Sequence, residues 1–348
     1  MSDNLLPPGR SLELSQQLLR GAIDMHVHAG PHIFSSPRRV DPVEAAIEAR
    51  DAGMRAIVYM DVFELSNGTS WIVNRVVKDF ETFGGLILNT VYGGMNPRAV
   101  KTALYYGTGA KYISFGAHST YFQAAREGKL VDGEFVPLSE LYPKFKEEEL
   151  DRCIRIPIGD EPIPPELDEI LRLIADHPHV YLNTGHISVP EALRLVELCG
   201  EYGIKRILVA SSVTKIATME ELRAMAGAGA YIEYTLAAYT HTTPIPKTHY
   251  YVEREYMSID EGMDTAPDGG VKKVAEQIRE LGAEHCILGS DFGVYTLPTP
   301  VEGFRNFVAC MLDLGIPPDD ITTMIRTNPE RLLDLEAWPD PVASPGEE

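Results

Sequence analysis

The sequence predicts a (β/α)8 barrel, on two observations. Eight short apolar runs, rich in β-branched and aromatic residues, alternate with helical patterns along nearly the whole chain. The intervals between the runs carry clear helix start signals. Eight strands and as many helices in 348 residues favour a closed barrel over a doubly wound open sheet, the second interpretation. The predicted strands are 22–28, 55–61, 85–91, 110–116, 179–185, 205–211, 230–236 and 285–291.

The helix starts follow capping rules. Asp41 is a predicted N-cap, Pro42 the first helical residue and Glu44 the acid that completes a capping box, while Gly53 ends this helix. The same spacing recurs at Ser188 with Glu191, Thr218 with Glu221, and Thr299 with Glu302, and Asn-Pro pairs at 96–97 and 328–329 predict two further starts.

Two connections are too long to be simple turns. One covers about 117–164 after the fourth strand and contains a predicted hairpin at Asp132-Gly133. The other covers about 237–268 after the seventh strand and is rich in aromatic residues and histidine. Both follow strands, so in a barrel both lie on the C-terminal face, where active sites form.

Composition limits the possible partners and compartments. We expect an N-terminal extension over 1–20, one barrel domain over 21–336 and a flexible tail over 337–348. A net charge of −20 opposes nucleic-acid binding, and no apolar run reaches the roughly 18 residues of a membrane span. The N-terminus does not resemble a secretory signal, and four scattered cysteines predict free thiols in the cytoplasm. A homo-oligomer is possible.

The stretch "DMHVH" carries the clearest chemical signal. Side chains alternate along a strand, so Asp24, His26 and His28 share one face at about 6.6 Å intervals, which in a barrel points inward. Two adjacent inward imidazoles suit two ligands of one metal ion. Asp24, one step deeper, is better placed to orient the ligands by accepting a hydrogen bond.

Other polar residues sort by the end of the strand that they occupy. His118 and His186 follow the fourth and fifth strands, and Asp291 ends the eighth, so all three belong to the C-terminal face. Three further histidines precede strands and are assigned to structure or solvent at the opposite face: His177, His179 and His285.

The order of these motifs resembles the amidohydrolase superfamily of metal-dependent barrel enzymes. The resemblance covers most of the chain, through "DMHVH", "NTGH", "GSDFG" and the C-terminal "TNPERLL" at 327–333. The segment "GGLILNTVYGGMNPRAVKTALYYG" is similar to an uncharacterised amidohydrolase-related branch of bacterial proteins.

The resemblance implies four metal ligands: His26, His28, His186 and Asp291. These ligands suit Zn²⁺, our first expectation, and also Mn²⁺ or Fe²⁺. Asp291 would accept the proton of an activated water. Binuclear members carry a bridging Lys or Glu after the fourth strand and a His after the sixth, where this chain has "SFGAH" and Ser211 or Ser212, so we expect one metal.

Several residues have more than one interpretation. His118 is a general acid or base, a ligand of a second metal, or a structural residue of a lid; Asp61 and Glu64 could assist a second metal or lie in solvent. Glu233 cannot be assigned inward or outward. His32 and the pair Arg38-Arg39 are candidates to bind a substrate carboxylate, with surface salt bridges the alternative for the two arginines. His241 and His249, in the second long loop, are either substrate contacts or solvent-exposed residues.

The expected function is therefore metal-dependent hydrolysis of a C–N or C–O bond in a small molecule, such as an amide, cyclic amide or lactone. A non-oxidative decarboxylase is the alternative within the same superfamily. A barrel that has lost catalysis and acts as a binding protein is the third interpretation.

Overall fold

The barrel strands form one parallel series around the molecule. The computed structural model describes residues 9–32, 37–239, 259–260 and 269–339. Neighbouring strands pair in parallel. The third barrel strand is divided at Gly84 into β3, which pairs with β2, and β4, which pairs with β5. The strands in order are β1 (Ile23–Val27), β2 (Ala56–Tyr59), β3 (Glu81–Phe83), β4 (Gly85–Ile87), β5 (Tyr112–Ser114), β8 (Tyr181–Asn183), β9 (Ile207–Val209), β10 (Tyr231–Thr235) and β12 (Cys286–Gly289).

The first and last strands close the ring. Val27 and Phe292 form a parallel bridge, and the His28 amide donates to the Phe292 carbonyl at 2.9 Å. All eight predicted strands are confirmed, the third beginning at Glu81 instead of residue 85. The open-sheet interpretation is wrong because β12 returns to β1.

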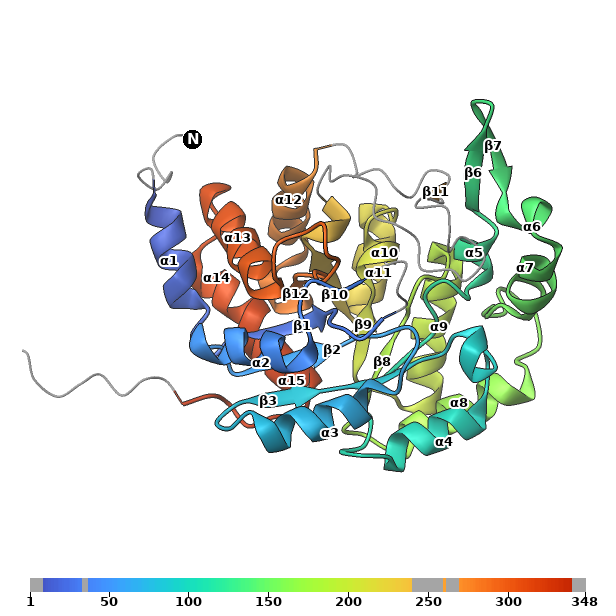
Figure 1. The fold of residues 1–348 in the computed structure, drawn as a ribbon, viewed down its shortest axis with the longest axis horizontal. Helices are drawn as coiled ribbons and strands as arrows, with labels where there is room; N and C mark the ends of the chain where they lie inside the picture. The colour runs from blue at the N-terminus through green and yellow to red at the C-terminus, as the bar shows by residue number, and fades with distance from the viewer. Residues whose placement is uncertain (1–8, 33–36, 240–258, 261–268, 340–348) are drawn as a thin grey trace, which may run out of the picture.

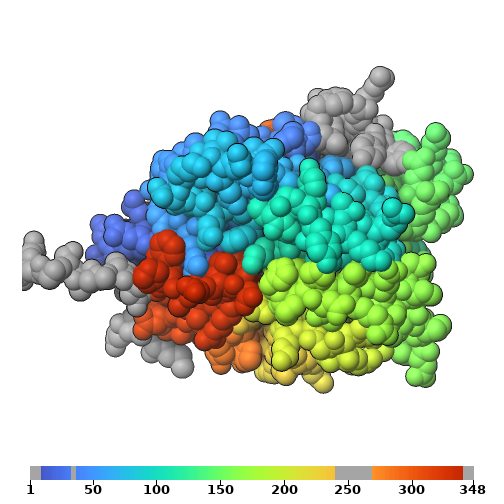
Figure 2. Space-filling model, turned by 90° about the horizontal axis from the view of Figure 1, so that it is seen from below, coloured from blue at the N-terminus to red at the C-terminus, as the bar shows by residue number. Residues whose placement is uncertain are grey.

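Helices cover the outside of the barrel (Figure 1). Seen from below, the outer segments follow one another in chain order around the molecule, as expected of a chain that winds once (Figure 2). The helix that precedes β1, α1 (Arg10–Leu18), packs on α13. The main helices of the ring are α2 (Pro42–Asp51), α3 (Ser66–Val76), α4 (Pro97–Tyr105), α8 (Pro165–Ala175), α9 (Val189–Tyr202), α11 (Met219–Gly227), α12 (Val271–Leu281) and α13 (Pro300–Asp313).

Most predicted caps are confirmed. Capping boxes form at Asp41, Ser188 and Thr218, and Asn96 caps α4 by accepting from the Arg98 amide. The box predicted at Thr299 is wrong. Its partner Glu302 instead pairs with Arg305 one turn later, because an arginine at i+3 offers this carboxylate a charged donor.

The predicted helix start at Asn328 is confirmed as the start of an element, but the chain before Asn328 is already helical. Helix α14 (Pro318–Thr322) continues through a π-helical turn (Thr323–Thr327) into α15 (Asn328–Leu332) without a break. The side-chain Nδ2 of Asn328 donates to the carbonyls of Ala283 and Cys286, each at 2.8 Å. The "TNPERLL" motif therefore fixes the base of β12.

The two long loops contact each other through a small antiparallel sheet. The predicted hairpin is confirmed as β6 (Glu127–Val131) and β7 (Glu134–Pro137), with Asp132 and Gly133 both at positive φ. The two-residue strand β11 (Ile259–Asp260), from the second loop, pairs with β6. Short helices fill the first loop: α5 (Tyr121–Ala124), α6 (Leu138–Leu141) and α7 (Pro143–Glu148). His241 and His249 lie outside the described residues.

The barrel interior is packed below the C-terminal face. A separate apolar cluster, made mainly of strand residues, includes Val58, Tyr112, Tyr181 and Ile287, all essentially buried. This packed floor leaves room for polar side chains only at the C-terminal mouth. Across the described ranges, no helix combines the length and apolar character that crossing a membrane requires.

Candidate metal centre

Two histidines of β1 and an aspartate after β12 converge at the mouth of the barrel. The Nε2 atoms of His26 and His28 lie 3.4 and 3.0 Å from Asp291 Oδ1. One ligand atom from each of the three residues lies within 4.8 Å of the other two. Both imidazoles are largely buried, at 13% and 14% exposure, so their partners in the protein decide their protonation.

The opposite ring nitrogens show which atoms face the centre as acceptors. His28 Nδ1 lies 2.5 Å from the Met60 carbonyl oxygen, which can only accept, so this nitrogen carries a proton. His26 Nδ1 lies 3.1 Å from Glu233 Oε1 and donates to this carboxylate in the same way. Each neutral ring then directs a lone pair from Nε2 towards Asp291.

Two imidazole lone pairs and a carboxylate oxygen repel one another unless a cation lies among them. A proton or a metal ion can supply that charge, and two nitrogens with one carboxylate oxygen suit Zn²⁺, Mn²⁺ or Fe²⁺. The described residues thus fit a divalent metal, with Nδ1–H groups already oriented by acceptors as metal-bound histidines require.

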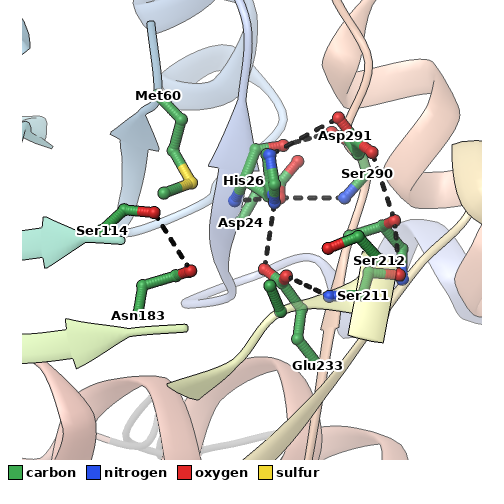
Figure 3. A network of polar contacts seen from close by, with 12 residues as sticks. Asp24, His26, Met60, Ser114, Asn183, Ser211, Ser212, Glu233, Ser290 and Asp291 are labelled. Atoms are coloured by element: carbon green, nitrogen blue, oxygen red, sulfur yellow. Dashed lines mark hydrogen bonds and ion pairs between the residues drawn. The ribbon is translucent and has the colours of Figure 1, made fainter. Parts of the chain in front are cut away.

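Glu233 is the carboxylate that holds His26. It lies on β10, its side chain is fully buried, and its Oε2 accepts from the Ser211 amide at 3.0 Å (Figure 3). The sequence left its direction open; the structure points it into the barrel. A signal was available in retrospect, since an acid within a strand covered on both faces needs a buried partner.

Asp24 supports the backbone at the site. Its Oδ1 accepts from the amides of His26 and Ser290, at 3.1 and 3.0 Å, and so ties β1 to the end of β12. We predicted that Asp24 orients the histidine pair. Asp24 accepts hydrogen bonds from main-chain amides, whereas the carboxylate that accepts from the His26 ring is Glu233. Burial raises the pKa of Asp24 to about 7.

Asp291 occupies a left-handed backbone conformation, with φ of 56°. Its amide donates to the His26 carbonyl at 2.8 Å, which fixes it beside β1. In the metal-free protein, where a proton takes the place of the cation, burial favours the neutral acid, but the charge of His26 and the hydrogen bond with His28 hold the pKa of Asp291 well below the usual range. A non-glycine residue in this conformation is often found at a functional site.

His186, the fourth predicted ligand, lies beside this cluster. Its amide donates to the Gly116 carbonyl, and its charge contributes to the lowered pKa of Asp291. It is outside the group of three whose ligand atoms lie within 4.8 Å of one another. The structure thus brings three of the predicted ligands together, and ligation by His186 stays a prediction.

His118 pairs with a buried acid of the first long loop. Its Nδ1 lies 3.0 Å from Glu127 Oε1, and the side-chain Nε2 of Gln123 donates to the same oxygen at 3.1 Å. It is not part of the metal cluster found among the described residues. Its three predicted roles stay predictions, now with a carboxylate that fixes its tautomer.

The acids after β2 are already engaged. Asp61 Oδ2 lies 3.1 Å from His32 Nδ1 and its Oδ1 accepts from the Phe63 amide at 2.7 Å. Glu64 accepts from the Thr69 hydroxyl at 3.0 Å. Neither acid joins the described metal cluster, and the His32–Asp61 pair lies in the loop next to it.

Serine and asparagine occupy the neighbouring strand ends. The Thr235 amide donates to the Ser211 hydroxyl at 3.1 Å, at the position where binuclear relatives would carry a histidine. The Ser114 hydroxyl and the Asn183 amide oxygen lie 3.3 Å apart on β5 and β8 (Figure 3). At the opposite face, away from the centre, His177 Nδ1 donates to the Leu173 carbonyl at 2.7 Å, and His177 Nε2 lies 3.1 Å from the Tyr105 hydroxyl.

Solved structures share this fold at low sequence identity. A mutant of a PTE-like lactonase from Deinococcus radiodurans has a TM-score of 0.51 at 12% identity, covering 92% of this chain and 97% of its own. A probable 2-pyrone-4,6-dicarboxylic acid hydrolase from Acinetobacter baumannii, with citric acid bound, has a TM-score of 0.52 at 11% identity, covering 90% and 100%. A resiniferatoxin-binding protein from Rhodobacter sphaeroides has 0.52 at 13%, covering 93% and 94%.

These similarities confirm the predicted fold, a (β/α)8 barrel. No match was found among curated proteins. A family model described as "Family of unknown function (DUF6282)" matches residues 21–233, which is more than half of the chain and runs from the first to the seventh barrel strand. The chain therefore belongs to the DUF6282 family.

Proposed function

We propose that this protein is a metal-dependent hydrolase that cleaves a C–O or C–N bond of a small molecule, such as a lactone or an amide. The observation that carries the proposal is the convergence of His26 Nε2, His28 Nε2 and Asp291 Oδ1, three acceptors that require a cation between them. A lactonase and a dicarboxylic acid hydrolase are among the solved structures with this fold.

The proposed ligands of one metal ion are His26, His28, His186 and Asp291. A bound divalent ion, Zn²⁺ or alternatively Mn²⁺ or Fe²⁺, would supply Lewis acidity that lowers the pKa of water and polarises a carbonyl. One metal is favoured over two because Asp61 has both oxygens engaged.

The chain's own groups supply the proton transfers. Asp291, ionised at neutral pH by its lowered pKa, accepts the proton of the attacking water as the water oxygen bonds to the carbonyl carbon. When the C–O or C–N bond breaks, the leaving oxygen or nitrogen needs a proton. We assign that step to His118, whose Nδ1 is held by Glu127.

The test is hydrolysis of a panel of lactones and amides by the metal-loaded protein. We expect turnover that falls by about 100-fold or more in Asp291→Asn, because a positioned general base contributes about that much. Asparagine tolerates positive φ, so the backbone is preserved. Asp79→Asn is the matched control, an exposed aspartate with φ of 59°.

Two outcomes would overturn the proposal. Full turnover in Asp291→Asn would remove Asp291 from the proton transfer. Release of CO₂ from aromatic carboxylic acids, without hydrolysis of any lactone or amide, would favour the decarboxylase.

The four cysteines are free thiols, which suits the proposed cytoplasmic location.

A further inference from the structure

Arg38 is a cation held by its backbone beside the loop that follows β12. It forms an antiparallel bridge with Val294, in the loop that follows β12, and the Arg39 amide donates to the Gly293 carbonyl at 2.6 Å. Its Nε is buried and unpaired among the described residues. A buried donor that makes no hydrogen bond costs folding energy, so the position of this Nε calls for another role.

The Arg38 guanidinium interacts electrostatically with Asp291 of the metal cluster and with Asp61 in the loop after β2. Burial lowers the pKa of Arg38, and the charges of Asp61 and Asp291 oppose this effect. The same positive charge lowers the pKa values of His28 and His32, although burial is the larger cause for both. The backbone gives the same picture, since Val294, the bridge partner of Arg38, is three residues from Asp291 along the chain.

A hollow of about 430 Å³ opens beside Arg38. His32 lines it as well, and the Nε2 of this ring is buried without a partner in the described part of the chain. Since His32 Nδ1 faces Asp61, a neutral ring offers Nε2 as an acceptor. The residues that line the hollow thus offer one unpaired donor, Arg38 Nε, and one unpaired acceptor, His32 Nε2.

We propose that Arg38 binds a carboxylate of the substrate, so that the substrates are small carboxylic acids with the scissile bond at the metal cluster. The guanidinium fork matches a carboxylate in geometry and charge. In a chain with net charge −20, such recognition requires a local cation of this kind. In naming the substrate class, this inference rests on the proposed function.

The same hollow disfavours a phosphate. Helix α2 begins at its rim, where a helix N-terminus would ordinarily attract a phosphate. Here the Asp41 side chain accepts from the Glu44 amide at 2.8 Å, and Glu44 accepts from the Asp41 amide at 2.9 Å. Both acids line the hollow and repel a dianion, whereas a monovalent carboxylate needs only Arg38.

The test measures binding of butyrate and of benzoate to the full-length protein by calorimetry, with and without a chelator. Both probes are monocarboxylates, because Asp41 and Glu44 disfavour a dianion. We expect either monocarboxylate to bind to the metal-free protein and to bind about 10- to 100-fold more weakly to Arg38→Gln, the usual loss for charged hydrogen bonds. Arg38→Lys should recover part of the affinity, because it restores the charge without the fork.

Arg39→Gln is the matched control, since it removes the same charge from the exposed neighbouring arginine. Unchanged binding in Arg38→Gln would overturn the inference, and so would an equal loss in Arg39→Gln, which would indicate only a long-range charge effect. Inorganic phosphate is the third probe, and tighter binding of phosphate than of either carboxylate would also overturn it.

Thermal stability separates a binding role from a structural one. Removing a buried, unpaired charge should raise the Tm of metal-free Arg38→Gln above that of the wild type. A lower Tm would show that Arg38 stabilises the fold instead, and would contradict the inference. The binding experiment with chelator needs neither metal nor turnover. Carboxylate binding can therefore fail while the hydrolase proposal holds, and the hydrolase proposal can fail while carboxylate binding holds.

Discussion

At the scale of single residues, the centre is defined by the acceptors behind its ligands. The Met60 carbonyl and the Glu233 carboxylate each take the proton of a histidine Nδ1 and so direct both Nε2 lone pairs to one point. The ligand types were predictable from "DMHVH". The tautomers were not, because they depend on β2 and β10, which lie far from β1 in the sequence.

Replacing Glu233 with glutamine tests this arrangement. An amide can donate to His26 Nδ1, which moves the ring proton to Nε2 and blocks the lone pair. We expect the metal Kd to rise about 10- to 100-fold, as for other groups that orient ligands. Titration with Zn²⁺ and a competing chelator measures it, with the exposed Glu276→Gln as control. An unchanged Kd would refute the role of Glu233.

The pH dependence of the metal-free protein follows from His26. Burial would lower its pKa, but the charges of Asp291 and Glu233 raise it from 6.5 to about 9. A raised pKa stabilises the fold fully below the unfolded value, and this stability is lost as pH rises through the folded value. The metal-free protein should therefore lose stability as pH increases from about 7 to about 9.

Thermal unfolding across this pH range, in the presence of chelator, measures the loss. His26→Gln should abolish the decline, whereas His285→Gln, at the opposite end of β12, should keep it. A wild-type Tm that stays flat or rises over the same range would contradict the assignment.

At the scale of elements, the site depends on the junction of β1 with the loop after β12. The Asp291 amide donates to the His26 carbonyl, and the His28 amide donates to the Phe292 carbonyl. Gly289 lets the strands approach, since a Cβ there would lie 3.3 Å from the His26 Cβ. The alternation of strands and helices predicted these elements, but not how closely the two chain segments pack at their ends.

Gly293 is the position where this packing is tightest. It has φ of 146°, and a Cβ built there would lie 1.8 Å from the His28 carbonyl oxygen. Gly293→Ala should destabilise the protein by about 3 kcal/mol or more and weaken metal binding, since His28 must move. Chemical denaturation and metal titration measure the two effects.

Gly203→Ala is the control for backbone strain alone. Gly203 ends α9 with φ of 78°, and nothing lies within 4 Å of a Cβ there. It should cost only about 1–2 kcal/mol and leave metal binding unchanged. An equal cost at the two glycines would contradict the steric argument for Gly293.

At the scale of the whole molecule, the sequence predicted the barrel and the convergence of strand ends because continuous apolar strands and capped helices are local patterns. Two details differed because a polar side chain had another partner. The Asn328 side chain donates to the carbonyls of Ala283 and Cys286 and does not cap a helix, and Glu302 pairs with Arg305 one turn along the same helix. Glu233 was missed because alternation gives the period of a strand but not its phase.

The most direct test of the account is the metal content of purified protein after loading and gel filtration. Wild type should hold about one equivalent of divalent metal, and His26→Ala and His28→Ala close to none, because each removes one of the converging ligands. His177→Ala and His179→Ala, the second H-x-H pair at the opposite face, should retain the wild-type content. Wild-type protein without metal, or His26→Ala and His28→Ala with a full equivalent, would contradict the metal centre.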